Sequence, residues 1–280
     1  MKNNIENVIE INNLTKDYGD GKGIFDISFS VNRGEVFGFL GPNGAGKTTT
    51  IRHLMGFMRS MEGECKINGM DCWGESAKIQ EKLGYIPGEI NFFDDMTGEE
   101  FLKFILKYRG MTVENRMYEL MDFFELNPKG KIKKMSKGMK QKIGIISAFM
   151  HNPDILILDE PTSGLDPLMQ NKFIELIEKE KQRGKTILLS SHIFEEVERT
   201  CDRIGIIRNG RMVAVDSVEN LRKRHMRTYD VTLKTPEEAK LFAKDFGGIA
   251  QGNEVRVSSR LSLEEIFLDY YRSGDDKNDK

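Results

Sequence analysis

The feature that most constrains this chain is a glycine-rich segment that follows the pattern G-x-x-x-x-G-K-[ST]. Its residues are Gly41, Pro42, Asn43, Gly44, Ala45, Gly46, Lys47 and Thr48, with Thr49 directly behind them. Residues 35–40 form a short apolar run typical of a buried strand, and residues 48–58 have the pattern of a helix. Strand, glycine-rich turn and helix in this order predict an α/β fold with a phosphate-binding loop.

Each residue type in this loop has a physical reason. The glycines let the backbone wrap a phosphate chain with several N–H groups pointing inward, and the helix N-terminus adds a positive dipole end. Lys47 would neutralise the β- and γ-phosphates, and the Thr48 hydroxyl would reach Mg²⁺, which prefers oxygen ligands. A glycine-rich turn with an accidental lysine is the structural alternative, and the flanking strand and helix disfavour it.

A second segment, residues 155–160, places four apolar residues before Asp159 and Glu160. In phosphate-loop NTPases the Asp at the end of such a strand holds magnesium, and a neighbouring acid can polarise the attacking water. Two acids alone would favour a solvated loop, but the phosphate loop favours catalysis. The chain lacks the N-K-x-D base-reading motif of GTPases and the G-x-G-x-x-G spacing of dinucleotide enzymes, so the predicted nucleotide is ATP.

The rest of the chain divides into regions of different pattern. Buried-strand patterns at 155–159, 186–190 and 203–207, with helical patterns between them, predict an α/β core with a mixed sheet. Residues 74–148 are mostly helical in pattern and predict a helical insertion subdomain. We expect a first domain over 1–221 and a small α+β accessory module over 222–280, whose charged tail from residue 273 is expected to be disordered.

Composition excludes several classes of protein. The 42 basic and 44 acidic residues of the 280-residue chain nearly cancel, which argues against a general nucleic-acid-binding surface. The longest uncharged runs, 36–46 and 143–153, are far shorter than the roughly 20 apolar residues that a membrane-spanning helix needs. Cys65, Cys72 and Cys201 are too few for a disulfide framework and predict buried or inert thiols.

Taken together, the sequences GPNGAGKTT at 41–49 and ILILDEPTSGLDP at 155–167 resemble the nucleotide-binding subunit of an ABC transporter. The resemblance covers about 8–221 and implies further site residues in the family's order. Tyr18 would stack on adenine, and Ser136 and Gly138 belong to a segment similar to the signature motif. Asp166 would belong to the D-loop, and His192 would be the switch histidine at the γ-phosphate. Taken singly, Tyr18 could be a surface residue, Ser136 a helix N-cap and His192 a packed loop residue.

The chain departs from the family pattern at two places. In the signature-like segment, Lys137 and Met139 stand where the family has a glycine and a glutamine. After Gly84-Tyr85-Ile86-Pro87, the family has a glutamine that senses magnesium, whereas here Gly88 takes that position and Glu89 follows. Glu89 is therefore a candidate metal ligand together with Thr48 and Asp159.

The resemblance implies a mechanism and partners. Two copies would form a head-to-tail homodimer with ATP at the interface, in which Glu160 is the general base and His192 orients the γ-phosphate. The membrane pore would be a separate permease, to which the chain attaches at the inner face of the membrane. The overall pattern resembles ATPases of bacterial drug or antibiotic exporters. Phe92 and Phe93 could anchor the permease or could belong to the helical-subdomain core, and both interpretations stay open.

The alternative function is a soluble ATP-dependent switch that acts on the ribosome or DNA. Such relatives usually carry two cassettes in one chain or a long coiled-coil insertion. This chain has one phosphate loop and no sustained heptads, and its balanced charge does not favour nucleic acid.

Overall fold

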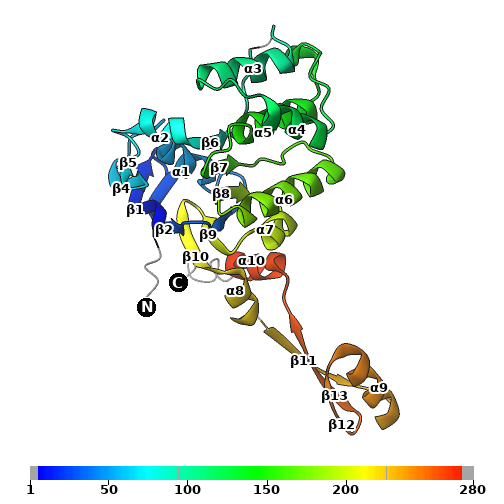
Figure 1. Ribbon diagram of the computed structural model, residues 1–280. Coiled ribbons are helices and arrows are strands. Elements are labelled where there is room, and N and C mark those ends of the chain that lie inside the picture. The colour runs from blue at the N-terminus through cyan, green and yellow to red at the C-terminus, as the bar shows by residue number, and fades with distance from the viewer. Residues whose placement is uncertain (1–5, 94, 225, 273–280) are drawn as a thin grey trace. The chain divides into compact units, whose positions relative to one another are not determined.

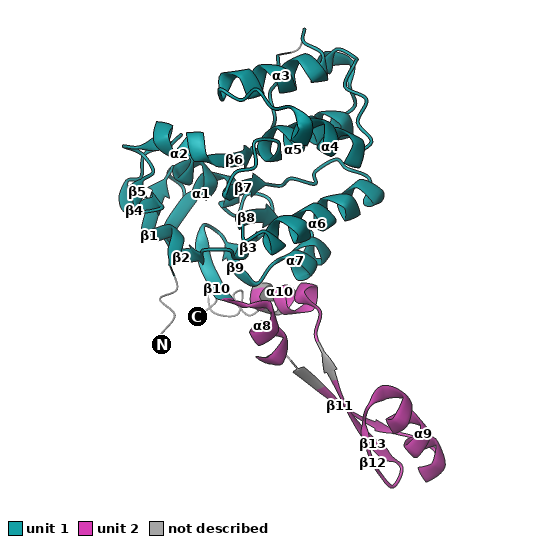
Figure 2. Cartoon of the chain, viewed as in Figure 1, with its two compact units in different colours: residues 1–215 teal, residues 216–280 magenta. Residues whose placement is uncertain are grey.

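The structure is a computed structural model that describes residues 6–93, 95–224 and 226–272. The chain separates into two compact units, residues 1–215 and 216–280 (Figure 2). The dividing point lies six residues before the domain boundary expected from the sequence, near the end of the strand Arg211–Ser217 and just before the helix Val218–Arg224. The predicted disordered tail from residue 273 lies outside the described residues.

A six-stranded sheet in the order β10-β9-β3-β8-β7-β6 forms the centre of the first unit (Figure 1). Its strands are β3 (Val36–Leu40), β6 (Leu83–Ile86), β7 (Ile155–Asp159), β8 (Thr186–Ser191), β9 (Arg203–Arg208) and β10 (Arg211–Ser217). Strand β3 pairs in parallel with β8 and β9, and β7 pairs in parallel with β6 and β8. The carboxyl ends of β3, β7 and β8 therefore meet at one edge, where the phosphate-loop, Asp159 and His192 segments begin.

A second, antiparallel sheet of four strands in the order β2-β1-β4-β5 packs against the first. Its strands are β1 (Asn7–Asp17), β2 (Gly23–Asn32), β4 (Glu62–Ile67) and β5 (Met70–Asp71). The inward side chains of β2 join those of β3 in one core, and the rings of Phe29 and Phe37 stack at 4.9 Å. The antiparallel sheet packs against the strand that precedes the phosphate loop, because Ile24 of β2 and Phe39 of β3 belong to the same core cluster.

Helices cover the sheets and form the insertion. The helices of the first unit are α1 (Lys47–Leu54), α2 (Ser76–Lys82), α3 (Gly98–Tyr108), α4 (Asn115–Phe123), η1 (Ile132–Lys134), α5 (Lys137–Phe149), α6 (Pro167–Gln182) and α7 (Phe194–Thr200). In Figure 1, α3, α4 and α5 gather at the upper end of the unit. The expected helical range 74–148 contains one element that the pattern did not indicate, the core strand β6, so the strand-free helical part begins at α3.

Local sequence signals start these helices. Thr97 caps α3 in a capping box with Glu100, and Ser136 caps α5 by accepting a hydrogen bond from the Met139 N–H at 3.2 Å. Asp166 caps α6, which then begins with a proline at its first position. The predicted Ser136 cap is therefore present, and the same serine stands at the start of the signature-like helix.

The second unit combines a three-stranded antiparallel sheet, in the order β11-β13-β12, with three helices. Its elements are α8 (Val218–Arg224), β11 (Met226–Thr232), α9 (Pro236–Phe246), β12 (Ile249–Gln251), β13 (Glu254–Arg260) and α10 (Leu263–Arg272). The α+β character agrees with the sequence expectation. A capping box between Ser262 and Glu265 starts α10.

Candidate active site

The glycine-rich loop has a backbone that side chains would disrupt. Gly44 and Gly46 have φ angles of 81° and 112°, and Gly46 is the N-cap of α1. A Cβ atom on Gly46 would lie 2.6 Å from Ile24 Cγ2, and one on Gly41 would lie 2.6 Å from the carbonyl oxygen of Ile207. Glycine is thus required by conformation at Gly44 and by both conformation and space at Gly46.

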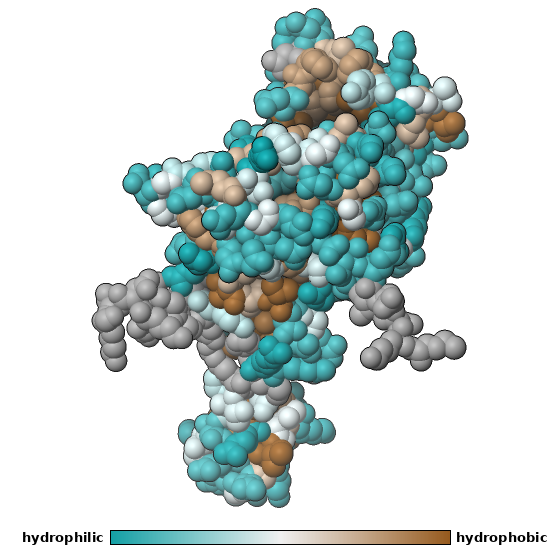
Figure 3. Space-filling view, turned by 90° about the vertical axis from the view of Figure 1, so that its left-hand side faces the viewer, coloured by the Kyte–Doolittle hydropathy of each residue, from teal (hydrophilic) through white to brown (hydrophobic). Residues whose placement is uncertain are grey.

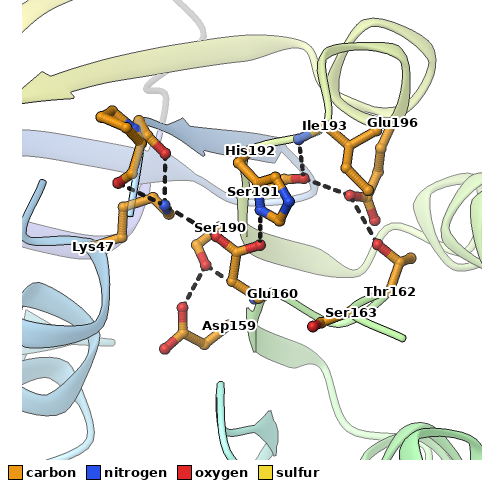
Figure 4. A network of polar contacts seen from close by, with 12 residues as sticks. Lys47, Asp159, Glu160, Thr162, Ser163, Ser190, Ser191, His192, Ile193 and Glu196 are labelled. Carbon is orange, nitrogen blue, oxygen red and sulfur yellow. Dashed lines mark hydrogen bonds and ion pairs between the residues drawn. The ribbon is translucent and has the colours of Figure 1, made fainter. Parts of the chain in front are cut away.

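Lys47, the first residue of α1, is almost completely buried in this loop. Its ammonium group donates hydrogen bonds to the carbonyl oxygens of Gly41 at 2.6 Å and Pro42 at 3.2 Å. It also forms an ion pair with Glu160, with 3.0 Å between Nζ and Oε1 (Figure 4). The loop backbone therefore surrounds the ammonium group of Lys47 and places a positive charge where a bound polyphosphate would need it.

Glu160 stands between Lys47 and His192. Its backbone is left-handed, with φ of 49°, and its N–H donates to the Ser190 hydroxyl at 3.1 Å. The second carboxylate oxygen, Oε2, contacts Nδ1 of the half-exposed His192 (Figure 4). An ionised carboxylate only accepts, so Nδ1 is the donor in this contact and Nε2 is left for another partner. Glu160 therefore contacts both of the other predicted catalytic side chains, Lys47 and His192.

Asp159 is fully buried at the end of β7 and has the features of a metal ligand. Its Oδ1 accepts a hydrogen bond from the Ser190 hydroxyl, and its Oδ2 is buried without a hydrogen-bond partner in the described structure. A Cβ atom on Gly88 would lie 3.1 Å from Oδ2 and 3.8 Å from Oγ1 of Thr48. A lone buried carboxylate oxygen beside a threonine hydroxyl fits a hard cation such as Mg²⁺. Within the described ranges, no group of three or more His, Cys, Asp or Glu side chains is placed to hold a metal by itself.

Two adjoining hollows bring most predicted residues together. The first, of about 470 Å³, is lined by Tyr18, Lys22, Gly23, Pro42, Asn43, Gly44, Gly46, Lys47, Thr48, Thr49 and Glu160. The second, of about 810 Å³, is lined by Asn43, Thr48, Arg52, Phe57, Tyr85, Pro87, Gly88, Glu89, Asn91, Lys137, Glu160, Ser163 and His192. Tyr18 is 53% exposed, and its hydroxyl contacts Met58 Sδ at 3.5 Å, which leaves the ring accessible for stacking.

Five predicted nucleotide-binding residues line neither hollow, and two of them, Gly41 and Ala45, belong to the glycine-rich loop itself. Ser136 and Asp166 serve as helix caps, and Gly138 packs so closely on the 163–165 turn that an added Cβ would lie 3.1 Å from the Gly164 carbonyl oxygen. Lys137, which replaces a family glycine, lays its stem over Gly164 and donates to the Ser163 hydroxyl at 3.1 Å. The signature-like and D-loop-like segments are therefore joined to each other within one copy.

Sequence reasoning missed several polar residues of the site. Ser190 bridges Asp159 and the Glu160 backbone, and Arg52 and Lys22 add positive charge to the hollows. Tyr85 stays a neutral phenol, because its burial and then the charge of Asp159 raise its pKa to about 12. For Ser190 the one sequence signal was its place at the end of an apolar run, two residues before His192. The three cysteines are buried and free, as expected, and burial raises the pKa of each thiol.

Comparisons with known proteins agree with this geometry. The family model for ABC transporters matches residues 24–163. The chain is 40% identical to the linearmycin resistance ATP-binding protein LnrL of Bacillus subtilis (strain 168) over 222 aligned residues. These residues cover 78% of this chain and 71% of that protein. This chain belongs to the ABC transporter family.

Other members of the ABC transporter family are similar over most of their length. The bacitracin transport ATP-binding protein BcrA of Bacillus licheniformis is 36% identical over 274 residues, which cover 94% of this chain and 90% of that protein. The solved ATP-binding subunit of an ABC transporter superposes with a TM-score of 0.71 at 34% identity, covering 78% and 92% of the two chains. The dimeric cassette MJ0796 bound to ADP and Pi superposes with a TM-score of 0.67 at 25% identity, covering 75% and 98%.

These findings confirm the predicted family, the fold class and ATP as the nucleotide. The chain is an ATP-binding subunit of an ABC transporter and hydrolyses ATP. The alternative function, a switch that acts on the ribosome or DNA, is not favoured. No helix of the described residues has both the length and the apolar composition to span a bilayer.

Proposed function

We propose that this chain powers a membrane exporter by hydrolysing ATP between two copies of itself. One observation carries the proposal: Glu160 joins the phosphate-loop lysine Lys47 to the exposed His192 at the carboxyl edge of the core sheet. This arrangement places a base, a cation and a second polar group around the hollow beside the loop. Relatives named for linearmycin resistance and bacitracin transport support export of antibiotic-like compounds.

Each site residue has a proposed role. The backbone of residues 41–46 cradles the phosphates, with Lys47 on the β- and γ-phosphates, and Thr48 and Thr49 complete the loop. Tyr18 stacks on the adenine, because its ring lines the same hollow as the loop. Glu160 accepts a proton from the attacking water, and His192 holds the γ-phosphate through Nε2.

We propose Thr48 and Asp159 as the residues that hold Mg²⁺. The buried, unpartnered Oδ2 of Asp159 supports this assignment. When bound, the ion would neutralise charge on the β- and γ-phosphates. Glu89 is exposed and lines the hollow, and a Cβ atom on the preceding residue, Gly88, would lie 3.1 Å from Oδ2 of Asp159. The assignment of Glu89 as a third Mg²⁺ ligand therefore stays a prediction.

A second copy of the chain completes the site in this proposal. Ser136, Gly138 and Asp166 do not line the hollows of their own copy, so they are available to a nucleotide held by a partner. The start of the 13-residue helix α5 at Ser136 suits a γ-phosphate, because backbone N–H groups and the helix dipole both attract anions. The solved dimeric cassette supports this arrangement.

The permease would dock on the helical part of the first unit. Figure 3 shows a hydrophobic area at the upper end of the molecule, where Figure 1 places α3. Phe93 is 55% exposed and meets Phe104 edge to face at 5.6 Å, whereas Phe92 is partly buried against Phe101. The two interpretations, permease anchor and helical-subdomain core, therefore apply to different residues. Phe93 is the better candidate anchor, and Phe92 is the better candidate for the core. Docking there would attach the chain peripherally to the membrane.

The experiment compares two kinds of partner. The full chain is co-expressed with a candidate permease, which is any multi-span membrane protein encoded in a neighbouring reading frame. ATPase activity is then measured with that protein, with ribosomes and with DNA. The proposal predicts co-purification with the membrane protein and stimulation by it alone. Phe93→Ser should weaken co-purification, whereas Tyr118→Ser, a change of a part-exposed aromatic on α4, should not. Stimulation by ribosomes or DNA alone would contradict the proposal.

A further inference from the structure

Glu196 is a buried carboxylate next to the active site to which no role has yet been assigned. It lies in α7, and only 2% of it is exposed. Its Oε2 accepts hydrogen bonds from the Ser191 hydroxyl at 2.6 Å and from the Thr162 hydroxyl at 3.3 Å (Figure 4). Its other oxygen, Oε1, has no hydrogen-bond partner in the described structure. A carboxylate in such a place is costly to bury, so its presence calls for a reason beyond packing.

The first partner of Glu196 controls the segment that carries His192. Ser191 directly precedes His192, and its hydroxyl oxygen also accepts a hydrogen bond from the Ile193 N–H at 3.0 Å. The serine therefore bonds to the residue after His192 while its own proton points to Glu196. This fixes the backbone on both sides of His192, the side chain that contacts Glu160.

The second partner belongs to the segment that carries Glu160. Thr162 lies two residues after Glu160, in a turn closed by the hydrogen bond from the Ser163 N–H to the Glu160 carbonyl oxygen at 3.1 Å. The Thr162 carbonyl oxygen accepts from the Leu165 N–H at 3.0 Å, at the turn that leads to α6. Glu196 thus holds, from one carboxylate, both segments whose side chains meet at the Glu160–His192 contact.

We propose that Glu196 is a positioning residue for ATP hydrolysis, which sets the distance between the His192 segment and the Glu160 segment through Ser191 and Thr162. The inference rests on the proposed roles of Glu160 and His192. It assigns no contact between Glu196 and the nucleotide, since Glu196 lines neither of the two hollows of the site. Its effect should therefore fall on turnover and not on ATP affinity.

The ionisation of Glu196 is in keeping with this role. Burial raises its pKa to about 7, the two hydroxyl hydrogen bonds oppose that rise, and the nearby Glu160 charge adds to it. The hydroxyls thus stabilise a carboxylate that its surroundings disfavour. An apolar residue would avoid the burial of a charge but would leave both hydroxyls without an acceptor.

The test measures kcat and KM for Mg-ATP on the full chain, with melting temperature as the folding control. Glu196→Ala should lower kcat by about tenfold or more with little change in KM, because two hydroxyls lose their acceptor. Glu196→Gln keeps one acceptor oxygen and should recover most of kcat. Glu195→Ala is the matched control, a change of the neighbouring glutamate on the same helix, whose side chain is 75% exposed, and it should leave both constants unchanged.

A double-mutant cycle makes the test specific. Ser191→Ala should lower kcat, and Glu196→Ala combined with Ser191→Ala should lower it little further, because both changes remove the same contact. If Glu196→Ala does not fold, Ser191→Ala and Glu196→Gln are compared instead, and wild-type kcat in Ser191→Ala would overturn the proposal. A folded Glu196→Ala with wild-type kcat, or additive losses in the cycle, would also overturn it.

Failure here is distinguishable from failure of the proposed function. Glu160→Gln is measured in the same series. If Glu160→Gln abolishes turnover while Glu196→Ala leaves it intact, the inference on Glu196 alone is wrong. If Glu160→Gln retains turnover, the catalytic assignment itself is wrong, whatever Glu196→Ala does.

Discussion

The ammonium group of Lys47 lies 3.0 Å from Oε1 of Glu160, so the proposed phosphate-binding cation and the proposed general base form an ion pair. Both groups are largely buried, with side-chain exposures of 5% and 17%. An incoming triphosphate competes with Glu160 for this cation. Binding of ATP should therefore release the carboxylate from Lys47 and free it to accept a proton from water.

Glu160→Gln should separate binding from turnover. The amide removes the negative charge that competes for Lys47, so we expect ATP affinity to be equal to that of the wild type or higher. Turnover should fall by about 100-fold or more, because the general base is lost. Equilibrium binding of a fluorescent ATP analogue and steady-state phosphate release measure the two effects. Weaker binding with normal turnover would exclude Glu160 from the role.

Asp159→Asn should change the magnesium requirement. Asparagine keeps an oxygen that can accept from the Ser190 hydroxyl but removes the anionic oxygen from the buried position. We expect the Mg²⁺ concentration for half-maximal turnover to rise by about tenfold or more, with little change in ATP binding in the presence of EDTA. A magnesium titration of ATPase activity measures this.

The same titration examines Glu89. Because Glu89 is exposed whereas Oδ2 of Asp159 is buried without a partner in the described structure, Glu89→Gln should shift the magnesium requirement much less than Asp159→Asn. Equal shifts would make Glu89 a ligand of the same rank.

Gly46→Ala should destabilise the protein more than the same change at a glycine that has a positive φ but open space around it. Gly110→Ala is the control, because Gly110 also has a positive φ, 69°, but has open space around an added Cβ. We expect a loss in free energy of unfolding of about 1 kcal/mol for Gly110→Ala and at least about 2 kcal/mol for Gly46→Ala, which also overlaps Ile24. Urea unfolding compares them, and equal losses would contradict the packing around Gly46.

Glu196→Gln should change how stability depends on pH. The pKa of Glu196 is raised from 4.5 to about 7 in the folded chain, so the folded state keeps a proton that the unfolded chain has already lost. Stability is therefore lost as pH rises through this interval, by an amount on the order of 3 kcal/mol at most. Glutamine does not ionise, so the variant should gain stability relative to the wild type between about pH 5 and about pH 8.

Unfolding by urea at several pH values measures that difference. Its change with pH is the informative quantity, since the amide adds a constant effect of its own. Glu195→Gln, at an exposed position, should show almost no change with pH relative to the wild type. A pH-independent difference between Glu196→Gln and the wild type would show that the carboxyl titrates normally.

The sequence predicted the parts of the site that are local in the chain. The phosphate loop and the strand before Asp159 each combine a recognisable pattern with a physical requirement within a dozen residues. Helix caps such as Ser136 and Ser262 were predictable for the same reason, because a cap depends on residues three positions apart.

The parts that could not be predicted depend on contacts between distant segments. Thr162 and Glu196 are 34 residues apart, and nothing in either segment indicates that they meet. Strand β6 was missed because four residues inside a helical pattern carry too little periodicity, and its identity comes from pairing with β7. Strand β4 was not predicted from the sequence, because its first three residues are exposed and two of them are glutamates.

The measurement that decides whether two copies seal the nucleotide is the molar mass of Glu160→Gln in solution, by light scattering, with and without Mg-ATP. We predict a monomer without nucleotide and a dimer with it. Adding Ser136→Asp keeps a good cap for α5 but places a negative charge at the partner's γ-phosphate, so the double variant should bind ATP and stay monomeric. A monomer in Mg-ATP despite saturated binding, or an undiminished dimer of the double variant, would contradict a shared site.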